Sequence, residues 1–271
     1  MKVESSQVKV QTDIRNGVCV LTLNDPPANT YSYEMMRELD AAILDARMNA
    51  AVHVIVLIGS GEKFFCAGAN INMLKDADYD FKYYFCLHAN ETLNRLEQTP
   101  KLVIAALNGH TVGGGLEVAM AADIRIAKKN AGKIGLPEVA LGVLPGTGGT
   151  QRLARIVGKS RAIELMATGR LMSMDEAHTL GIVTDVWDDE KLAGKSFADA
   201  IVEYATEFVP PNKASRAVGR MKRAVQSGTE AGFGEGLAIE RELQQLLFQS
   251  DDAKEGIAAS LEKRKAVFKG N

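Results

Sequence analysis

Two glutamates in one glycine-rich stretch are the residues best suited to chemistry in this sequence. Glu117 follows three consecutive glycines, Gly113 to Gly115, and Glu138 comes 21 residues later, directly after a proline. The first N–H groups of a helix have no partner within that helix and carry partial positive charge. A helix over 116–122 would aim such groups at a carbonyl oxygen. Two carboxylates beside that oxyanion site could act as a general acid and a general base.

Each of these features also has a structural explanation. A run of glycines is commonly a flexible loop, and a glutamate in a first helical turn commonly stabilises the helix dipole. Cys66 could act as a nucleophile, but a buried free cysteine is the ordinary case. His110 lies near the glycines, and an isolated histidine more often makes a structural hydrogen bond.

Other known site motifs fail in this chain. A phosphate-binding loop needs Lys-Ser or Lys-Thr after its last glycine, and the stretch 142–147 lacks this pair. A dinucleotide fingerprint at 146–148 would need Gly or Ala where Gln151 stands. The four histidines are scattered, without metal-ligand spacing. We therefore expect no metal and no cofactor beyond the substrate itself.

The composition is that of a soluble globular protein. The chain has 271 residues, 46% of them hydrophobic and 24% charged, with a net charge of −2. This charge balance does not favour nucleic acid as a partner, and the longest apolar runs are too short to span a membrane. The N-terminus, MKVESSQVKVQ, has no apolar segment like that of a signal peptide. The three cysteines have no metal spacing, so we expect reduced thiols in a cytoplasmic protein.

Alternating strands and helices must position the glutamates. β-branched and apolar runs predict strands over 8–14, 18–23, 52–58, 102–107, 124–127 and 183–187. Helical spacing predicts helices over 33–47, 79–98, 116–122, 146–157 and 159–168, and a capping box of Ser173 and Glu176 opens another that ends at Gly181. The segment 59–74 is expected to be a glycine-rich loop at a strand end, where ligands often bind in α/β folds; a plain connection is the alternative.

The character of the chain changes after Glu190. Only amphipathic helical segments follow, predicted over 191–208, 213–227, 232–249 and 253–268. The sequence thus predicts an α/β body over residues 1–190 and an all-helical region over residues 191–271. Such a region could cover the body or pack on a neighbouring subunit.

Four sequence blocks carry a resemblance to a known family. The chain resembles the crotonase (enoyl-CoA hydratase/isomerase) superfamily over nearly its whole length. The blocks are Pro27-Ala28-Asn29 with the residues that follow, Phe65-Cys66-Ala67-Gly68-Ala69-Asn70-Ile71, Asn108-Gly109-His110 through Glu117, and Pro137-Glu138 through Leu153. Their order and spacing together are highly specific.

The resemblance implies a spiral of β/β/α units, a helical C-terminal region that mediates trimer formation, often as a dimer of trimers, and an acyl-CoA thioester as ligand. The motif match places an oxyanion hole at the backbone N–H groups of Ala69 and Gly114, with Glu117 as base and Glu138 as acid. The residues implied to contact substrate or coenzyme A are Ala28, Ala67, Gly68, Ala69, Asn70, Ile71, Asn72 and Gly114. The family usually has Asp at Asn70, and many relatives have Phe at Ser260; we expect little effect from the first change.

The retained carboxylates favour one activity within the resemblance. Family isomerases of simple enoyl chains often lose the acid at the position of Glu117, and dienoyl isomerases tend to carry an Asp where this chain has Gly146. We therefore expect a 2-enoyl-CoA hydratase. An enoyl-CoA isomerase or another CoA-thioester lyase is the nearest alternative. A non-catalytic RNA-binding or scaffold member of the fold is the alternative from a different class.

Overall fold

A six-stranded sheet forms the centre of the protein. The computed structural model describes residues 7–271, so MKVESS, on which the expectation about a signal peptide partly rests, lies outside the described residues. The strand order is β1 (Val10–Arg15), β2 (Val18–Leu23), β3 (Val54–Gly59), β5 (Leu102–Leu107), β7 (Ile124–Lys128) and β9 (Asp185–Trp187). β1 and β2 form the predicted antiparallel hairpin, and the other neighbours are parallel.

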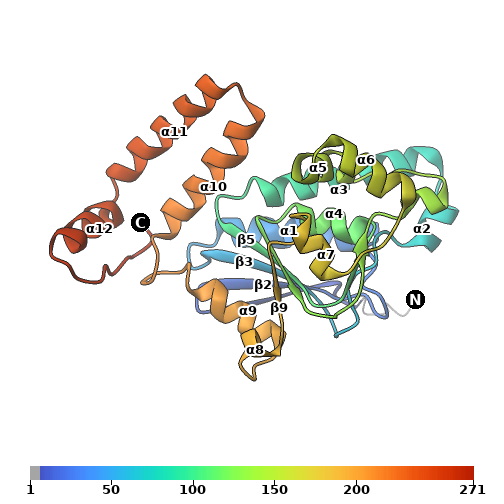
Figure 1. Ribbon diagram of the computed structural model, residues 1–271, viewed down its shortest axis with the longest axis horizontal. Coiled ribbons are helices and arrows are strands. Elements are labelled where there is room, and N and C mark those ends of the chain that lie inside the picture. Colours follow the sequence, from blue (N-terminus) through green and yellow to red (C-terminus); the bar gives the residue numbers. More distant parts are fainter. Residues whose placement is uncertain (1–6) are drawn as a thin grey trace, which may run out of the picture.

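The central strands are buried on both faces, as their unbroken apolar sequences predict. In β3, Ile55 and Leu57 belong to one hydrophobic core, whereas Val54, Val56 and Ile58 belong to a second core on the opposite face. The first core is covered by α1 (Tyr33–Met48), α3 (Tyr79–Glu97) and α4 (Gly114–Met120). The second core packs against α9 (Phe197–Thr206). Figure 1 shows these helices on opposite sides of the sheet.

A second, three-stranded sheet was not predicted from the sequence. Its strands are β4 (Phe64–Cys66), β6 (His110–Val112) and β8 (Ile134–Gly135), paired in that order and parallel. Each follows a strand of the main sheet after a short connection, so the chain forms repeated β/β/α units. This arrangement confirms the expected fold class. It also corrects the expectation of a glycine-rich loop over 59–74, because that segment contains β4 and the start of α2 (Ile71–Asp76).

Most predicted helices are present, with changed ends. The remaining helices of the body are α5 (Gly149–Val157), α6 (Lys159–Thr168), α7 (Met174–Thr179) and α8 (Asp189–Leu192), with the 3-10 turn η1 (Glu138–Leu141). The helix expected over 191–208 is divided into α8 and α9, because Ala193 and Gly194 adopt left-handed backbone angles, with φ of 50° and 78°. The Ser173 hydroxyl caps α7 as predicted, whereas the Glu176 carboxylate accepts a hydrogen bond from Arg170.

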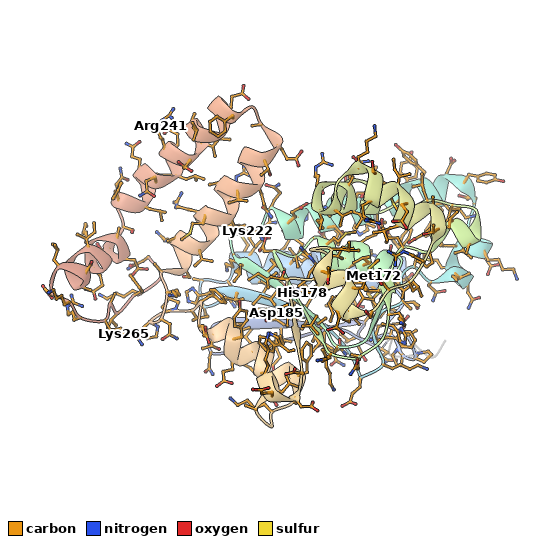
Figure 2. All side chains as sticks on the ribbon, in the orientation of Figure 1. Met172, His178, Asp185, Lys222, Arg241 and Lys265 are labelled. Atoms are coloured by element: carbon orange, nitrogen blue, oxygen red, sulfur yellow. The ribbon has the colours of Figure 1, made fainter. Side chains whose placement is uncertain are left out.

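The last three helices form an arm that extends from the body (Figure 1). They are α10 (Ser215–Glu230), α11 (Phe233–Phe248) and α12 (Asp251–Leu261), so the helix expected over 253–268 ends earlier. The base of the arm is fixed by a buried ion pair, in which the Lys222 Nζ lies 2.8 Å from Asp123 Oδ2. Figure 2 shows Lys222 on α10, where that helix approaches the body. Among residues 7–271, no helix combines the length and apolar character needed to cross a membrane.

Candidate active site

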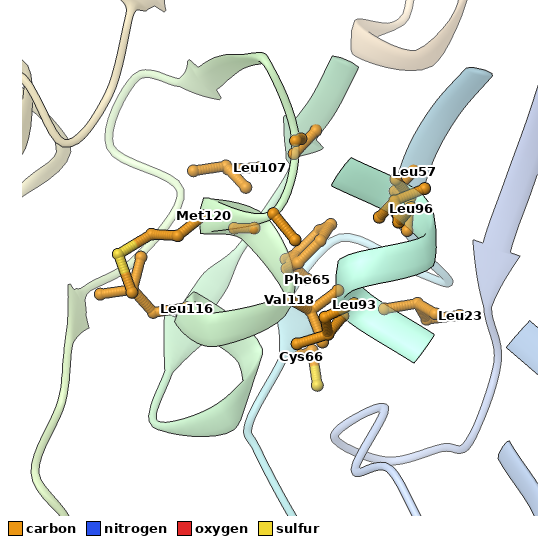
Figure 3. Packing of buried hydrophobic residues seen from close by; sticks show 14 of the residues in the cluster. Leu23, Leu57, Phe65, Cys66, Leu93, Leu96, Leu107, Leu116, Val118 and Met120 are labelled. Carbon is orange, nitrogen blue, oxygen red and sulfur yellow. The ribbon is translucent and has the colours of Figure 1, made fainter. Parts of the chain in front are cut away.

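The three glycines are required by close packing around the start of α4. Gly113 adopts φ of 58°, a backbone angle that side chains disfavour, and turns the chain from β6 into α4. A Cβ on Gly114 would lie 2.2 Å from the Tyr31 hydroxyl, and a Cβ on Gly115 would lie 2.0 Å from the Cys66 carbonyl oxygen. The glycines are therefore a tightly packed junction, which rules out the flexible-loop alternative. Figure 3 shows α4 residues packed with Phe65 in the buried core.

Two backbone N–H groups lie on adjoining segments beside this junction. Tyr31 bridges residue 69 in parallel fashion: its N–H donates to the Gly68 carbonyl at 3.0 Å, and its carbonyl accepts from Asn70 at 2.9 Å. The N–H of Ala69 consequently faces the other way. A Cβ on Gly68 would lie 3.0 Å from the Gly114 nitrogen, so the two segments adjoin. Within the described part of the chain, the N–H groups of residues 69 and 114 have no acceptor, which leaves both available to an oxyanion.

Glu117 is buried and held by three donors. Its Oε1 accepts from the backbone N–H groups of Thr147 at 2.8 Å and Gly149 at 2.7 Å, and its Oε2 accepts from the Thr147 hydroxyl. Burial raises the pKa of Glu117, and these hydrogen bonds act in the opposite direction. The first turn of α4 thus presents a carboxylate that the turn before α5 orients.

Glu138 reaches the same junction from η1. A Cβ on Gly113 would lie 2.9 Å from its Oε1, so the side chain touches the glycine turn. Its Oε2 is buried and has no hydrogen-bond partner among residues 7–271. Burial, with a further contribution from the charge of Glu117, raises the pKa of Glu138 to about 7. A carboxyl group with such a pKa can donate a proton near neutral pH.

The other predicted ligand contacts lie along the connection between β4 and α2. The Ala28 carbonyl accepts from the Ala67 N–H at 3.1 Å, which joins the first two sequence blocks. Asn70 caps α2 by accepting from the Met73 N–H, as an aspartate there would, which supports the small expected effect of this departure. Ile71 and Asn72 form the first turn of α2, and Ile71 is exposed. Their contacts with coenzyme A stay a prediction.

The other candidates from the sequence have structural surroundings. Burial raises the pKa of the Cys66 thiol to about 12, which does not suit a nucleophile. The Nδ1 of His110 accepts a hydrogen bond from the Lys133 N–H at 3.1 Å, which is a structural role. Among residues 7–271, no three His, Cys, Asp or Glu side chains are grouped so that they could hold a metal ion.

Two buried hydroxyls near Glu117 were missed by the sequence analysis. The Tyr31 Oη lies 3.2 Å from the Thr147 Oγ1, which in turn contacts Glu117. Tyr31 and Thr147 are 116 positions apart, so no local pattern could pair them. Both residues lie within the sequence blocks that carry the family resemblance, and that resemblance was the only signal in the sequence that could have linked them to the site.

The sequence and the fold have close counterparts among known proteins. The family model described as enoyl-CoA hydratase/isomerase matches residues 13–271, and the chain belongs to that family.

The chain is similar to named relatives over most of its length. The chain is 41% identical over 261 residues to a probable enoyl-CoA hydratase of Rhizobium meliloti, covering 96% of each chain. It is 38% identical over 251 residues to a short-chain-enoyl-CoA hydratase of Clostridium acetobutylicum, covering 92% of each. The crystal structure of an enoyl-CoA hydratase from Bacillus anthracis superimposes with a TM-score of 0.90 at 33% identity, covering 97% of this chain and all of that one.

Proposed function

We propose that this protein is an enoyl-CoA hydratase, which adds water across the 2,3 double bond of a 2-enoyl-CoA thioester to give a 3-hydroxyacyl-CoA. The observation that carries the proposal is the convergence of Glu117 and Glu138 on the glycine turn, where the free N–H of residue 114 adjoins the segment that carries the free N–H of residue 69. The family and the named relatives support it.

The N–H groups and the carboxylates have complementary tasks in hydration. The thioester oxygen accepts from the N–H groups of Ala69 and Gly114. Glu117 takes a proton from water as the water oxygen bonds to C3, and the π electrons move onto the thioester as an enolate. Glu138 then gives its proton to C2 as the carbonyl re-forms. Each oxyanion donor contributes about 3–4 kcal/mol in comparable enzymes.

The role of each carboxylate follows from its surroundings. Glu117 accepts three hydrogen bonds, which favour its charged form against the effect of burial, whereas burial raises the pKa of the half-buried Glu138 to about 7 and its Oε2 has no hydrogen-bond partner among residues 7–271. Because their charges interact, a pH profile reports apparent pKa values of the pair. The coenzyme is part of the substrate, and the strip formed by Ala28 and residues 67–72 would bind it mainly through the backbone.

Alternative activities differ in what they need from this site. An isomerase moves a proton from one carbon to another, for which one carboxylate suffices. Another CoA-thioester lyase of the same family is the other alternative. Both carboxylates are present here, which favours hydration. The same retention, with the net charge of −2, argues against a non-catalytic RNA-binding or scaffold role.

The same proposal includes a trimer or a dimer of trimers. No residue of α11 is buried within the single chain, and the arm exposes Met221, Val225, Leu246, Phe248 and Ile257. An extended apolar surface of this kind is typical of a subunit interface. The three free cysteines are consistent with the cytoplasm as the proposed location.

A paired assay in H₂¹⁸O tests the proposed reaction. Crotonyl-CoA or a close relative should yield a 3-hydroxyacyl-CoA labelled at C3, much faster than any 3-enoyl-CoA is isomerised. Rapid conversion of 3-enoyl-CoA to 2-enoyl-CoA, with no labelled hydroxyacyl product from any 2-enoyl-CoA offered, would replace the hydratase by an isomerase.

A further inference from the structure

The carboxylate of Glu117 is the end of a buried chain of hydroxyl groups. Glu117 Oε2 contacts the Thr147 hydroxyl, and the Thr147 oxygen lies 3.2 Å from the Tyr31 hydroxyl. The three residues retain only 2%, 2% and 3% of their surface exposure, respectively. They come from α4, from the turn before α5 and from the segment that bridges residue 69, so the chain crosses three separate parts of the site.

The direction of these hydrogen bonds is fixed by counting protons. A threonine hydroxyl has one proton, which it donates to Glu117 Oε2. Its oxygen can then only accept from Tyr31. Burial, and next the charge of Glu117, hold the pKa of the Tyr31 phenol well above its usual value, so this donor keeps its proton. The Tyr31 hydroxyl therefore donates to the Thr147 hydroxyl, which donates to the Glu117 carboxylate.

We propose that Tyr31 and Thr147 are positioning residues that keep Glu117 ionised and orient it toward the substrate water. This inference rests on the proposed function. A carboxylate offers about four acceptor positions. Two on Oε1 are taken by backbone N–H groups and one on Oε2 by Thr147, which leaves a single position on Oε2 for a water molecule.

Burial, hydrogen bonds and nearby charges together determine the pKa of Glu117. Burial is the largest influence on its pKa and favours the neutral acid, while the positive charge of Arg152 on α5 favours the anion. Glu138 from η1 and the Cys86 thiol from α3 lie near the same carboxylate; burial, with a further contribution from the negative charge on Glu117, raises the pKa of each. Among the influences that lower the pKa of Glu117, the hydrogen bond from the Thr147 hydroxyl comes first, ahead of the backbone N–H groups of Gly149 and Thr147 and the charge of Arg152.

The ring of Tyr31 has a packing role separate from its hydroxyl. The ring closes over Gly114 and lies 5.8 Å from the Phe85 ring, measured between centroids. Tyr31→Phe keeps this packing and removes the donor. Thr147→Val keeps the shape of the side chain and removes the hydroxyl, whereas Thr147→Ser keeps the hydroxyl.

Steady-state hydration of crotonyl-CoA across pH tests the inference. We expect Thr147→Val to lower kcat about tenfold or more, Tyr31→Phe about threefold to tenfold, and both to move the acid limb of kcat/KM to higher pH, with KM within about twofold. Thr147→Ser should restore most of the rate. Because Tyr31 acts through Thr147, adding Tyr31→Phe to Thr147→Val should cost no further activity.

The controls separate this inference from the proposed function. Thr92 is also fully buried, and its hydroxyl has no partner among residues 7–271, so Thr92→Val should leave kcat unchanged. Absence of hydration by the unmodified protein would overturn the proposed function. Hydration by the unmodified protein, with an unshifted acid limb in Tyr31→Phe and in Thr147→Val or with additive losses in the double variant, would overturn the positioning role alone. Thermal melting checks that each variant is folded.

Discussion

In the proposed mechanism Glu117 and Glu138 carry out two separate proton transfers, although both side chains reach the same glycine turn. We predict that Glu117→Gln and Glu138→Gln each lower kcat for hydration at least about 10²-fold, the usual contribution of a positioned acid or base. Glutamine keeps the size of the side chain, so thermal melting should show folded protein in both cases. Near-normal turnover in either folded variant would contradict the two-carboxylate mechanism.

The raised pKa of Glu138 also predicts how activity depends on pH. An acid with a pKa of about 7 loses its proton as the pH rises through neutrality. We therefore expect kcat/KM for hydration to fall on the alkaline side of an apparent pKa near 7. In Glu138→Gln, this alkaline limb should be absent from the residual rate. An unchanged limb in that variant would assign the limb to another group.

The same pKa has a consequence for stability. In the unfolded chain Glu138 has the ordinary pKa of a glutamate, 4.5, whereas burial in the folded protein raises its pKa to about 7. Unfolding therefore releases a proton between these values, and the contribution of Glu138 to stability is lost as the pH rises from 4.5 to 7. After allowance for solvent screening, Glu138→Gln should be about 1 kcal/mol more stable than the unmodified protein at pH 8, with the difference vanishing near pH 4. Denaturant titrations at both pH values measure this.

A buried ion pair between Lys222 and Asp123 is one of the contacts that hold helix α10 against the body. Burial lowers the pKa of Lys222 and raises that of Asp123, so each charge is stabilised chiefly by the other. We predict that Lys222→Met, which leaves Asp123 unpaired, destabilises the protein by about 3 kcal/mol. Adding Asp123→Asn should recover part of the loss, because it removes the stranded charge. A double variant less stable than Lys222→Met, measured by urea unfolding, would contradict this explanation.

The arm exposes apolar side chains that could form an interface between subunits. We predict three or six chains per particle by sedimentation or light scattering. Phe248→Asp introduces a charge at an exposed apolar position of α11 and should weaken the association, because burying a lone charge is unfavourable. Met48→Asp, at an exposed position at the end of α1 in the body, should leave the association unchanged. A monomeric unmodified protein at micromolar concentration would contradict the proposed assembly.

The sequence alone identified the main strands and the two glutamates, because local chemistry specifies them. Unbroken apolar runs such as 102–107 can be satisfied only by burial, and the glycines before Glu117 mark a turn whatever surrounds it. The three short strands β4, β6 and β8 were missed, since two or three residues contain no measurable period. The break between α8 and α9 was missed as well, because Ala193 adopts its left-handed angle without a residue type that predicts it.

The environment of the site was decided only by the tertiary structure. Sequence blocks could assign Glu117 and Glu138 to two separate motifs of one family, but burial raises their pKa values, and burial depends on elements far apart in the chain. Likewise, Gly68 adjoins Gly114 only because separate β/β/α units pack against each other. The same packing brings Tyr31, Thr147 and Glu117 together in one chain of hydrogen bonds. Local sequence determines which groups are available for chemistry. Long-range packing determines which of them meet, because contact and desolvation are properties of the folded chain.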